Sequence, residues 1–278
     1  VQAYMKFIME NSEEAELIAE LERKQRDAAA TGAELIGDIA SRRAGPTPSR
    51  LAPLTDEQSA RRDAENRERE RDREMRARAE LWRAFVDVRG SRYADCRLET
   101  FDTSSPKQAA AVKALKEYRG TLADRLADGE GVVLFGPKGT GKDHLLVALC
   151  PVLFAMGKRV VWQNGMDLFG EMRDRMDSGE SERALVARLV YPDVLYLSDP
   201  VPPIGSLSEF QASMMFRILD GRYSRRKATW CSVNVSKGSE LEERMGPQNV
   251  DRLRDGALSI HCDWPSYRTV SKHVTGRE

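Results

Sequence analysis

The sequence predicts an α/β fold, a parallel sheet covered by helices on both faces. Two observations support this prediction. Short apolar runs alternate with segments of helical periodicity from about residue 92 onward, and a glycine-rich loop joins one such run to one such segment. Parallel strands need crossover connections, and strands buried on both faces are apolar throughout. Strands are expected at 131–135, 158–162, 193–197, 229–235 and 258–262, and helices at 142–155, 166–176, 181–190 and 209–223.

The α/β domain is expected at 91–278. The chain before it divides by composition into three segments. Residues 1–40 carry apolar positions at helical spacing, and residues 41–54 hold a glycine and three prolines, which is typical of a linker. A charged helix is then expected at 55–90. The sequence therefore predicts an N-terminal helical extension joined to the α/β domain.

The charged segment begins with Thr55 and Gln58 at the spacing of a capping box. Acidic residues precede basic ones by four positions, as in Glu74 and Arg78, and such pairs stabilise a helix by about 0.2–0.5 kcal/mol each. A nucleic-acid-binding arm is an alternative. The segment 56–86, however, holds nine acidic and nine basic residues, which favours a solvated helix.

Composition excludes several classes of protein. The 44 basic and 44 acidic residues cancel, so overall charge gives no argument for nucleic-acid binding. The four cysteines lack a Cys-x-x-Cys spacing and the three histidines are dispersed, which argues against a disulfide framework or a zinc site. No apolar run approaches the roughly 18 residues of a membrane span, and no signal peptide is recognised, so a cytoplasmic protein is expected.

The strongest motif is GPKGTGK, from Gly136 to Lys142. Glycines let the backbone curl around a phosphate chain with its amide groups pointing inward, and the lysine adds positive charge for the β- and γ-phosphates. The strand before the loop and the helix after it supply the context that this motif requires. The loop is therefore expected to bind a nucleotide through Gly136, Pro137, Lys138, Gly139, Thr140, Gly141, Lys142, Asp143 and His144.

Two aspartates are candidate Mg²⁺ ligands. Asp143 stands where such loops normally carry Ser or Thr; it could bind the metal directly, act through a water molecule, or turn away as a capping residue. Asp199 ends an apolar strand, the arrangement that holds Mg²⁺ opposite a phosphate loop. Pro200 follows where hydrolysing enzymes of this kind usually carry Glu, so hydrolysis is expected to be slow or to use another acid, Glu209 or Asp220.

These motifs resemble the AAA+ ATP-binding proteins of the DnaC/IstB type. The similarity runs from Tyr93 to Arg268, about two thirds of the chain, and its more specific strings are VDRLR at 250–254 and DWPSYR at 263–268. The resemblance implies ATP and Mg²⁺ as cofactors and an AAA+ fold. It also implies catalytic roles for Lys142 and Asp199, a sensor role for Asn234 and Arg268, and an arginine finger at Arg252, for which Arg254 is a competitor.

The family includes replicative-helicase loaders, whose N-terminal helical region grips the helicase. The resemblance therefore implies a loader acting with a replicative helicase and single-stranded DNA, self-associating through Arg252. Two alternatives stay open: a transposition helper ATPase, and a nucleotide-gated scaffold with little hydrolysis, which Pro200 favours. Arg222, Arg225, Arg226 and Lys227, with Tyr223, form the densest basic cluster, for which a basic helix end is a better interpretation than DNA contact.

Overall fold

The computed structural model describes residues 55–268, so the expectations for residues 1–40 and 41–54 lie outside the described residues. The described chain forms two compact units, which we treat separately. The smaller consists of residues 55–84 with 154–157, and the larger of residues 85–153 and 158–268.

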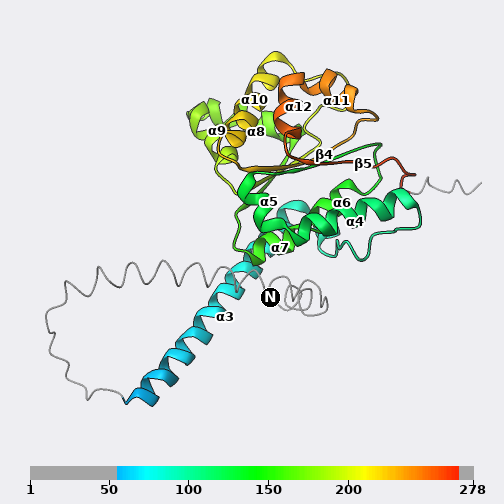
Figure 1. Cartoon of the computed structure of the whole chain (residues 1–278). Coiled ribbons are helices and arrows are strands. Elements are labelled where there is room, and N and C mark those ends of the chain that lie inside the picture. The colour runs from blue at the N-terminus through cyan, green and yellow to red at the C-terminus, as the bar shows by residue number, and fades with distance from the viewer. Residues whose placement is uncertain (1–54, 269–278) are drawn as a thin grey trace, which may run out of the picture. The chain divides into compact units, whose positions relative to one another are not determined.

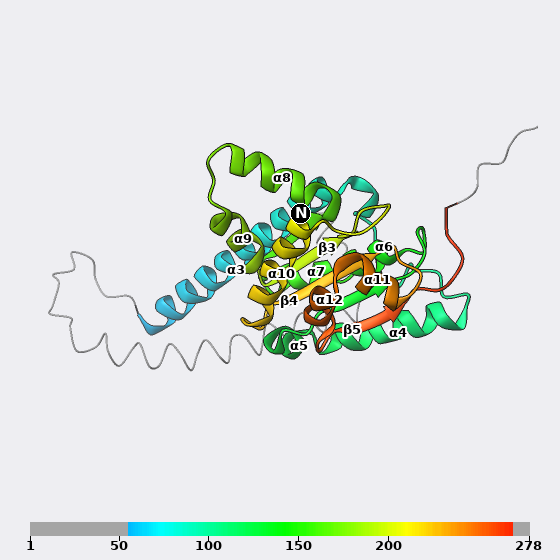
Figure 2. The same ribbon diagram turned by 90° about the horizontal axis from the view of Figure 1, so that it is seen from above.

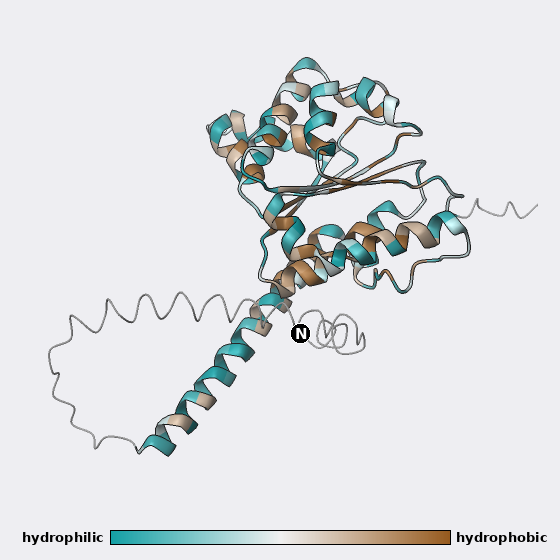
Figure 3. Ribbon diagram, viewed as in Figure 1, coloured by the Kyte–Doolittle hydropathy of each residue, from teal (hydrophilic) through white to brown (hydrophobic). Residues whose placement is uncertain are grey.

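The smaller unit consists mainly of the charged helix. Helix α3 (Asp56–Arg89) begins here and its last residues belong to the larger unit. The predicted capping box is formed: Gln58 donates its backbone N–H to Thr55 Oγ1 (3.3 Å), and Thr55 donates its own to Gln58 Oε1 (3.1 Å). The helix is hydrophilic along most of its length (Figure 3). Towards its end the helix makes an apolar contact, where the rings of Trp82 and Phe154 lie 5.9 Å apart.

A five-stranded parallel sheet forms the centre of the larger unit, which confirms the predicted fold class. Its order is β2-β3-β4-β1-β5, and every neighbouring pair is parallel. The strands are β1 (Val132–Phe135), β2 (Val160–Asn164), β3 (Val194–Ser198), β4 (Ala228–Val233) and β5 (Leu258–His261). The central strands β1, β3 and β4 are almost wholly buried, which explains their uninterrupted apolar character.

Helices cover both faces of this sheet (Figures 1 and 2). On one face lie α8 (Gly165–Asp177), α9 (Glu182–Val190), α10 (Glu209–Tyr223), α11 (Gly238–Met245) and α12 (Pro247–Arg254). The core on this face joins Met215 and Ile218 of α10 to Leu195 and Leu197 of β3. On the other face lie α4 (Pro106–Gly120), α5 (Leu122–Asp128) and α6 (Lys142–Val147), where Trp230 donates to Tyr118 Oη (3.2 Å).

The helix expected at 142–155 is interrupted. It forms α6 and then α7 (Cys150–Ala155), because Pro151 lacks the backbone N–H that a continuous helix needs and its ring crowds the preceding turn. The intervening residues tighten instead, as Leu149 donates to the Leu146 carbonyl three residues earlier (3.2 Å). Within residues 55–268, no helix is both long and apolar enough to cross a membrane.

Arg222 lies in the last turn of α10, as the helix-end interpretation of the basic cluster expects. Its side chain is fully buried (0% exposed) and holds the end of α10 to the sheet. The guanidinium donates to Thr229 Oγ1 and to the carbonyls of Leu189, Val190, Pro192, Asp193 and Ala228. Arg222 is therefore not available for contact with DNA.

Candidate nucleotide-binding site

The candidate site lies at the carboxyl ends of the central strands, the usual ligand position of a parallel sheet. The loop 136–141 joins β1 to α6, so it starts at the end of β1. Asp199 follows β3 and Asn234 follows β4 directly, and β4 pairs with both β1 and β3. The sheet order thus brings the predicted loop, acid and polar sensor together.

Two loop glycines hold conformations that other residues rarely adopt. Gly139 and Gly141 both have φ +84°, in the left-handed region. A Cβ atom at Gly141 would lie 2.7 Å from a ring carbon of Phe101, and one at Gly139 would lie 2.0 Å from Ser266 Oγ. Both the backbone shape and the packing around it therefore need glycine here.

The C-terminal segment closes over this loop. Trp264 donates its indole N–H to the Thr140 carbonyl (2.8 Å), and Tyr267 donates its backbone N–H to the Gly139 carbonyl (2.9 Å). Thr140 in turn donates its hydroxyl to the Pro137 carbonyl (3.0 Å), so its side chain shapes the loop rather than facing solvent. Segments far apart in sequence therefore stabilise one loop conformation.

The Lys142 ammonium has four acceptors within reach, of which Thr140 Oγ1 is the most distant at 3.5 Å. Its Nζ donates to the carbonyls of Gly136 (2.8 Å) and Pro137 (2.7 Å) and to Asn234 Oδ1 (2.8 Å). Its side chain is buried, and burial lowers the pKa of the ammonium below its ordinary value. A lysine ammonium has three N–H donors, so a phosphate that binds Lys142 must replace or share one of these contacts.

Asp199 and Asn234 form a second linked pair. Asn234 donates its backbone N–H to Asp199 Oδ1 (3.0 Å) and its side-chain amide to Oδ2 (2.7 Å). Burial, together with the negative charge of Asp143, raises the pKa of Asp199 above its ordinary value. A carboxylate offers about four lone-pair positions, so Asp199 retains acceptor capacity.

Asp143 is committed to contacts inside the protein. It accepts from the hydroxyls of Tyr196 (2.6 Å), Ser232 (2.5 Å) and Ser198 (3.2 Å), and Arg89 lies 2.9 Å from its second oxygen. Burial opposes ionisation, but Arg89 and the hydroxyls of Ser232 and Tyr196 hold the pKa of Asp143 below its ordinary value.

These contacts do not fit a direct Mg²⁺ ligand at Asp143, because its lone pairs are already used. Asp199 accepts two hydrogen bonds from Asn234, whereas the Asp143 carboxylate has four partners around it. Across the described part of the chain, no cluster of three or more His, Cys, Asp or Glu residues is arranged to hold a metal.

A cavity of about 350 Å³ opens beside the loop. Eight residues expected at the site line it: Gly139, Gly141, Lys142, Asp143, His144, Asp199, Asn234 and Arg268. Its other walls include aromatic residues that were not among the expected site residues, such as Tyr93, Phe101 and Tyr267. The Phe101 ring meets those of His144 (5.5 Å) and Tyr267 (5.6 Å) edge-on. Apolar walls beside phosphate-binding groups suit the base and sugar of a nucleotide.

Among the other expected site residues, His144 acts mainly as a support. Its Nε2 lies 2.8 Å from the Arg97 carbonyl, so it holds the segment that carries the cavity wall. Lys138 is exposed at the loop tip. Neither Glu209 nor Asp220, the two alternative acids, lines the cavity.

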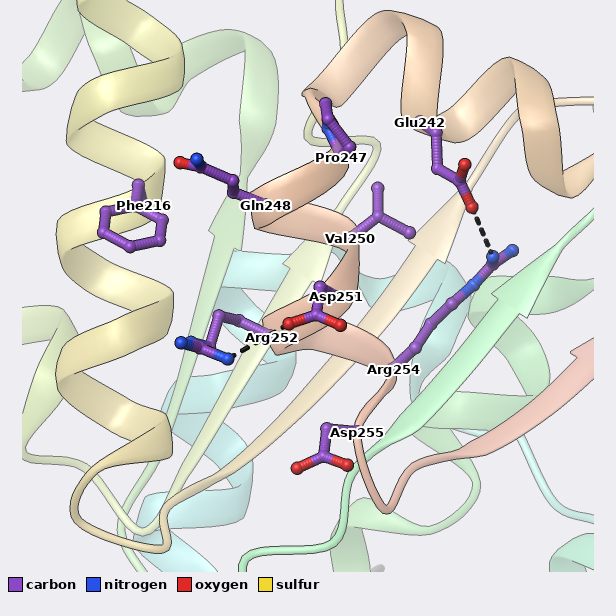
Figure 4. A pocket seen from close by; sticks show the side chains of 9 residues that line it. All are labelled: Phe216, Glu242, Pro247, Gln248, Val250, Asp251, Arg252, Arg254 and Asp255. Atoms are coloured by element: carbon purple, nitrogen blue, oxygen red, sulfur yellow. Dashed lines mark hydrogen bonds and ion pairs between the residues drawn. The ribbon is translucent and has the colours of Figure 1, made fainter.

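Arg252 and Arg254 lie away from this cavity. Both line a separate hollow of about 780 Å³ around α12 (Figure 4). Arg252 pairs with Asp220 and Asp251, each at 3.0 Å, whereas Arg254 pairs with Glu242 at 3.3 Å. Of the three arginines expected to act on nucleotide, Arg268 alone lines the cavity beside the loop.

Comparisons with known proteins agree with this geometry. A family model described as IstB-like ATP binding protein matches residues 66–268, which include every cavity-lining residue. The replicative helicase loader DnaC of Escherichia coli strain K12 is 28% identical over 186 residues, covering 66% of this chain and 72% of that protein. A putative insertion sequence ATP-binding protein of Sinorhizobium fredii strain NBRC 101917 / NGR234 is 34% identical over 156 residues, covering 52% of this chain and 49% of that protein.

Solved structures show the same fold. The crystal structure of the DnaC helicase loader superposes with a TM-score of 0.55 at 23% identity, covering 62% of this chain and 99% of that chain. The crystal structure of DnaI gives a TM-score of 0.50 at 19% identity, covering 64% of this chain and 94% of that chain. At these identities the likeness concerns the fold alone.

Proposed function

Since the chain belongs to the family of IstB-like ATP-binding proteins, we propose that it is an ATP-dependent loader that places a replicative helicase on single-stranded DNA. The observation that carries this proposal is the similarity to the replicative helicase loader DnaC, which extends over 72% of that protein. The site geometry supports the nucleotide-dependent part of the proposal. ATP would occupy the 350 Å³ cavity, with its phosphates at the loop and its base among the aromatic walls.

Lys142 and Asn234 provide a local response to nucleotide. Because Lys142 Nζ donates to Asn234 Oδ1, a γ-phosphate that draws the ammonium away releases the Asn234 amide oxygen. The Asn234 backbone carbonyl also accepts from Arg244 (3.5 Å), which donates to the Gly205 carbonyl (2.9 Å). The loop that follows Asp199 is thereby connected to the phosphate site. Ile204 at its tip is 91% exposed, a surface available to a partner.

Hydrolysis is proposed to be slow. Pro200 follows Asp199 where a glutamate would orient the attacking water, and proline has no side-chain acceptor for a proton. Mg²⁺ bound with ATP would meet Asp199, whose carboxylate retains lone pairs, and would neutralise phosphate charge there. Arg268, which lines the cavity, is proposed to contact the phosphates.

Self-association is proposed to use the surface around α12. Arg252 is 31% exposed and lines a hollow separate from the cavity beside the phosphate loop. A residue that reaches the nucleotide of a neighbouring subunit has to lie outside its own subunit's site. Its ion pairs with Asp220 and Asp251 would hold it until a phosphate competes for the guanidinium.

A loading assay tests the proposal. The purified chain is mixed with the replicative helicase of the same organism and circular single-stranded DNA, with ATP or ADP, and the helicase retained on DNA is measured. ATP-dependent retention that is lost in Lys142→Ala is the expected result. Equal retention without the protein would refute the loader function, and selective ATP-dependent binding to duplex DNA would instead indicate a transposition helper.

A further inference from the structure

A buried arginine lies directly behind the phosphate loop. Arg89, the last residue of α3, has a side chain only 6% exposed. Its guanidinium carbon lies 4.1 Å from the centre of the Tyr93 ring and 4.5 Å from that of Trp162, and it donates to Tyr196 Oη (3.3 Å). Aromatic faces attract a cation, most strongly where water is excluded. Arg89 is therefore a firmly placed positive charge.

The ionic partner of Arg89 is Asp143, which stands at the position where phosphate loops normally carry a metal ligand. Asp143 follows Lys142, where phosphate loops usually present a hydroxyl to Mg²⁺. Here Arg89 lies 2.9 Å from Asp143 Oδ2, and the Tyr196 and Ser232 hydroxyls occupy Oδ1. Ser198 Oγ lies within reach of both oxygens (3.2 and 3.4 Å).

Exchange of this arginine for a metal ion would be costly. Arg89 is 6% exposed and Asp143 28%, so breaking their ion pair would leave a charge uncompensated in a largely buried place, and the rings around Arg89 would lose their cation as well. Mg²⁺ also gives up its water ligands reluctantly and demands octahedral geometry, which four protein donors already in place around one carboxylate do not offer. The Arg89–Asp143 pair is thus neutral as a unit and closed to a divalent ion.

We propose that Arg89 is a built-in cation of this nucleotide site, which replaces the metal at the eighth position of the loop and makes ATP binding nearly independent of Mg²⁺. Arg89 does this by neutralising Asp143, so that the phosphates meet Lys142 and Arg268 without an opposing negative charge from the eighth residue of the loop. A metal that arrives with ATP is held by the nucleotide and Asp199 alone. This inference rests on nucleotide binding in the proposed function and not on helicase loading.

Equilibrium binding of ATP to the purified chain tests it, measured by calorimetry in excess Mg²⁺ and in excess EDTA. We expect the dissociation constant to differ less than about threefold between the two buffers. A weakening of tenfold or more in EDTA would overturn the inference and leave the proposed function standing. Absence of ATP binding in both buffers would overturn both.

A double variant that keeps the net charge of the protein tests the role of Arg89 directly. The double substitution Arg89→Met with Asp143→Thr removes both charges and restores a hydroxyl to the loop, so its ATP binding should weaken about tenfold or more in EDTA. Arg159→Met makes the same change at an exposed arginine and should bind like the wild type in both buffers. Magnesium independence in the double variant would overturn the role of Arg89. If that variant does not fold, the wild-type comparison decides by itself.

Discussion

Replacement of Arg222 by Met should destabilise the protein strongly, although the residue lies in a sequence rich in surface charge. The substitution preserves much of the side-chain volume but removes all the donors. Five backbone carbonyls and the Thr229 hydroxyl then lose a partner in the interior. Burial lowers the pKa of Arg222 to about 9, which still leaves it charged at neutral pH.

The size of the effect follows from these contacts. Each buried acceptor left without a partner costs about 1–3 kcal/mol, while relief from burying a charge offsets part of the sum. We expect a net loss of about 3–5 kcal/mol in the free energy of unfolding. For a domain of about 150–250 residues, this corresponds to a fall in Tm of about 6–20 °C.

Urea unfolding followed by circular dichroism measures this loss. The matched control is Arg226→Met, four residues along the chain and exposed, which should change stability by no more than about 0.5 kcal/mol. A loss below about 1 kcal/mol for Arg222→Met, at an unchanged m-value, would refute the assignment of Arg222 as a buried tie between α10 and the sheet.

Three further predictions concern the site. Lys142→Ala should weaken ATP binding at least about tenfold while preserving the circular dichroism spectrum, and unchanged affinity in calorimetry would contradict its phosphate role. Gly141→Ala should also weaken binding at least about tenfold, since the new methyl group would meet the Phe101 ring; a fluorescent nucleotide bound normally would argue against this packing. Asp143→Asn should destabilise the protein at neutral pH. Because the pKa of Asp143 is lowered from 3.8, the difference from wild type should be full above pH 3.8 and vanish as the pH falls through the folded-state pKa. A difference that is constant with pH in urea unfolding would contradict the ion pair.

Periodicity and the loop motif were sufficient to predict the sheet and the centre of the site. All five strands were predicted within two residues at each end. For β1, β3 and β4 the reason is that a strand buried on both faces is apolar throughout. Helix α10 was predicted with its observed bounds. Helices α4, α5, α11 and α12 were missed. The last three have only seven or eight residues each, and such short segments give little periodic signal.

Some residues of the site could not be predicted from the sequence, because they depend on tertiary contacts that the spacing of residues does not reveal. Arg89 belongs to a helix of mixed charge, where nothing marks it out from its neighbours, and Asp143 follows a motif that predicts a metal ligand. In the folded chain the Arg89 guanidinium lies 2.9 Å from Asp143 Oδ2. Phe101 precedes β1 and Tyr267 follows β5 in the sequence, yet their rings lie 5.6 Å apart beside the loop.

The central claim is that ATP bound at this loop controls engagement of a replicative helicase, and a partner-dependent turnover measurement tests it most directly. Phosphate release is followed for wild type and Lys142→Ala, alone and with helicase and single-stranded DNA, together with ATP binding. The account predicts ATP binding with slow release by the wild type alone, ATP-dependent complex formation with the helicase, and loss of both binding and complex in Lys142→Ala. A helicase complex that forms equally well without ATP and with Lys142→Ala would contradict it.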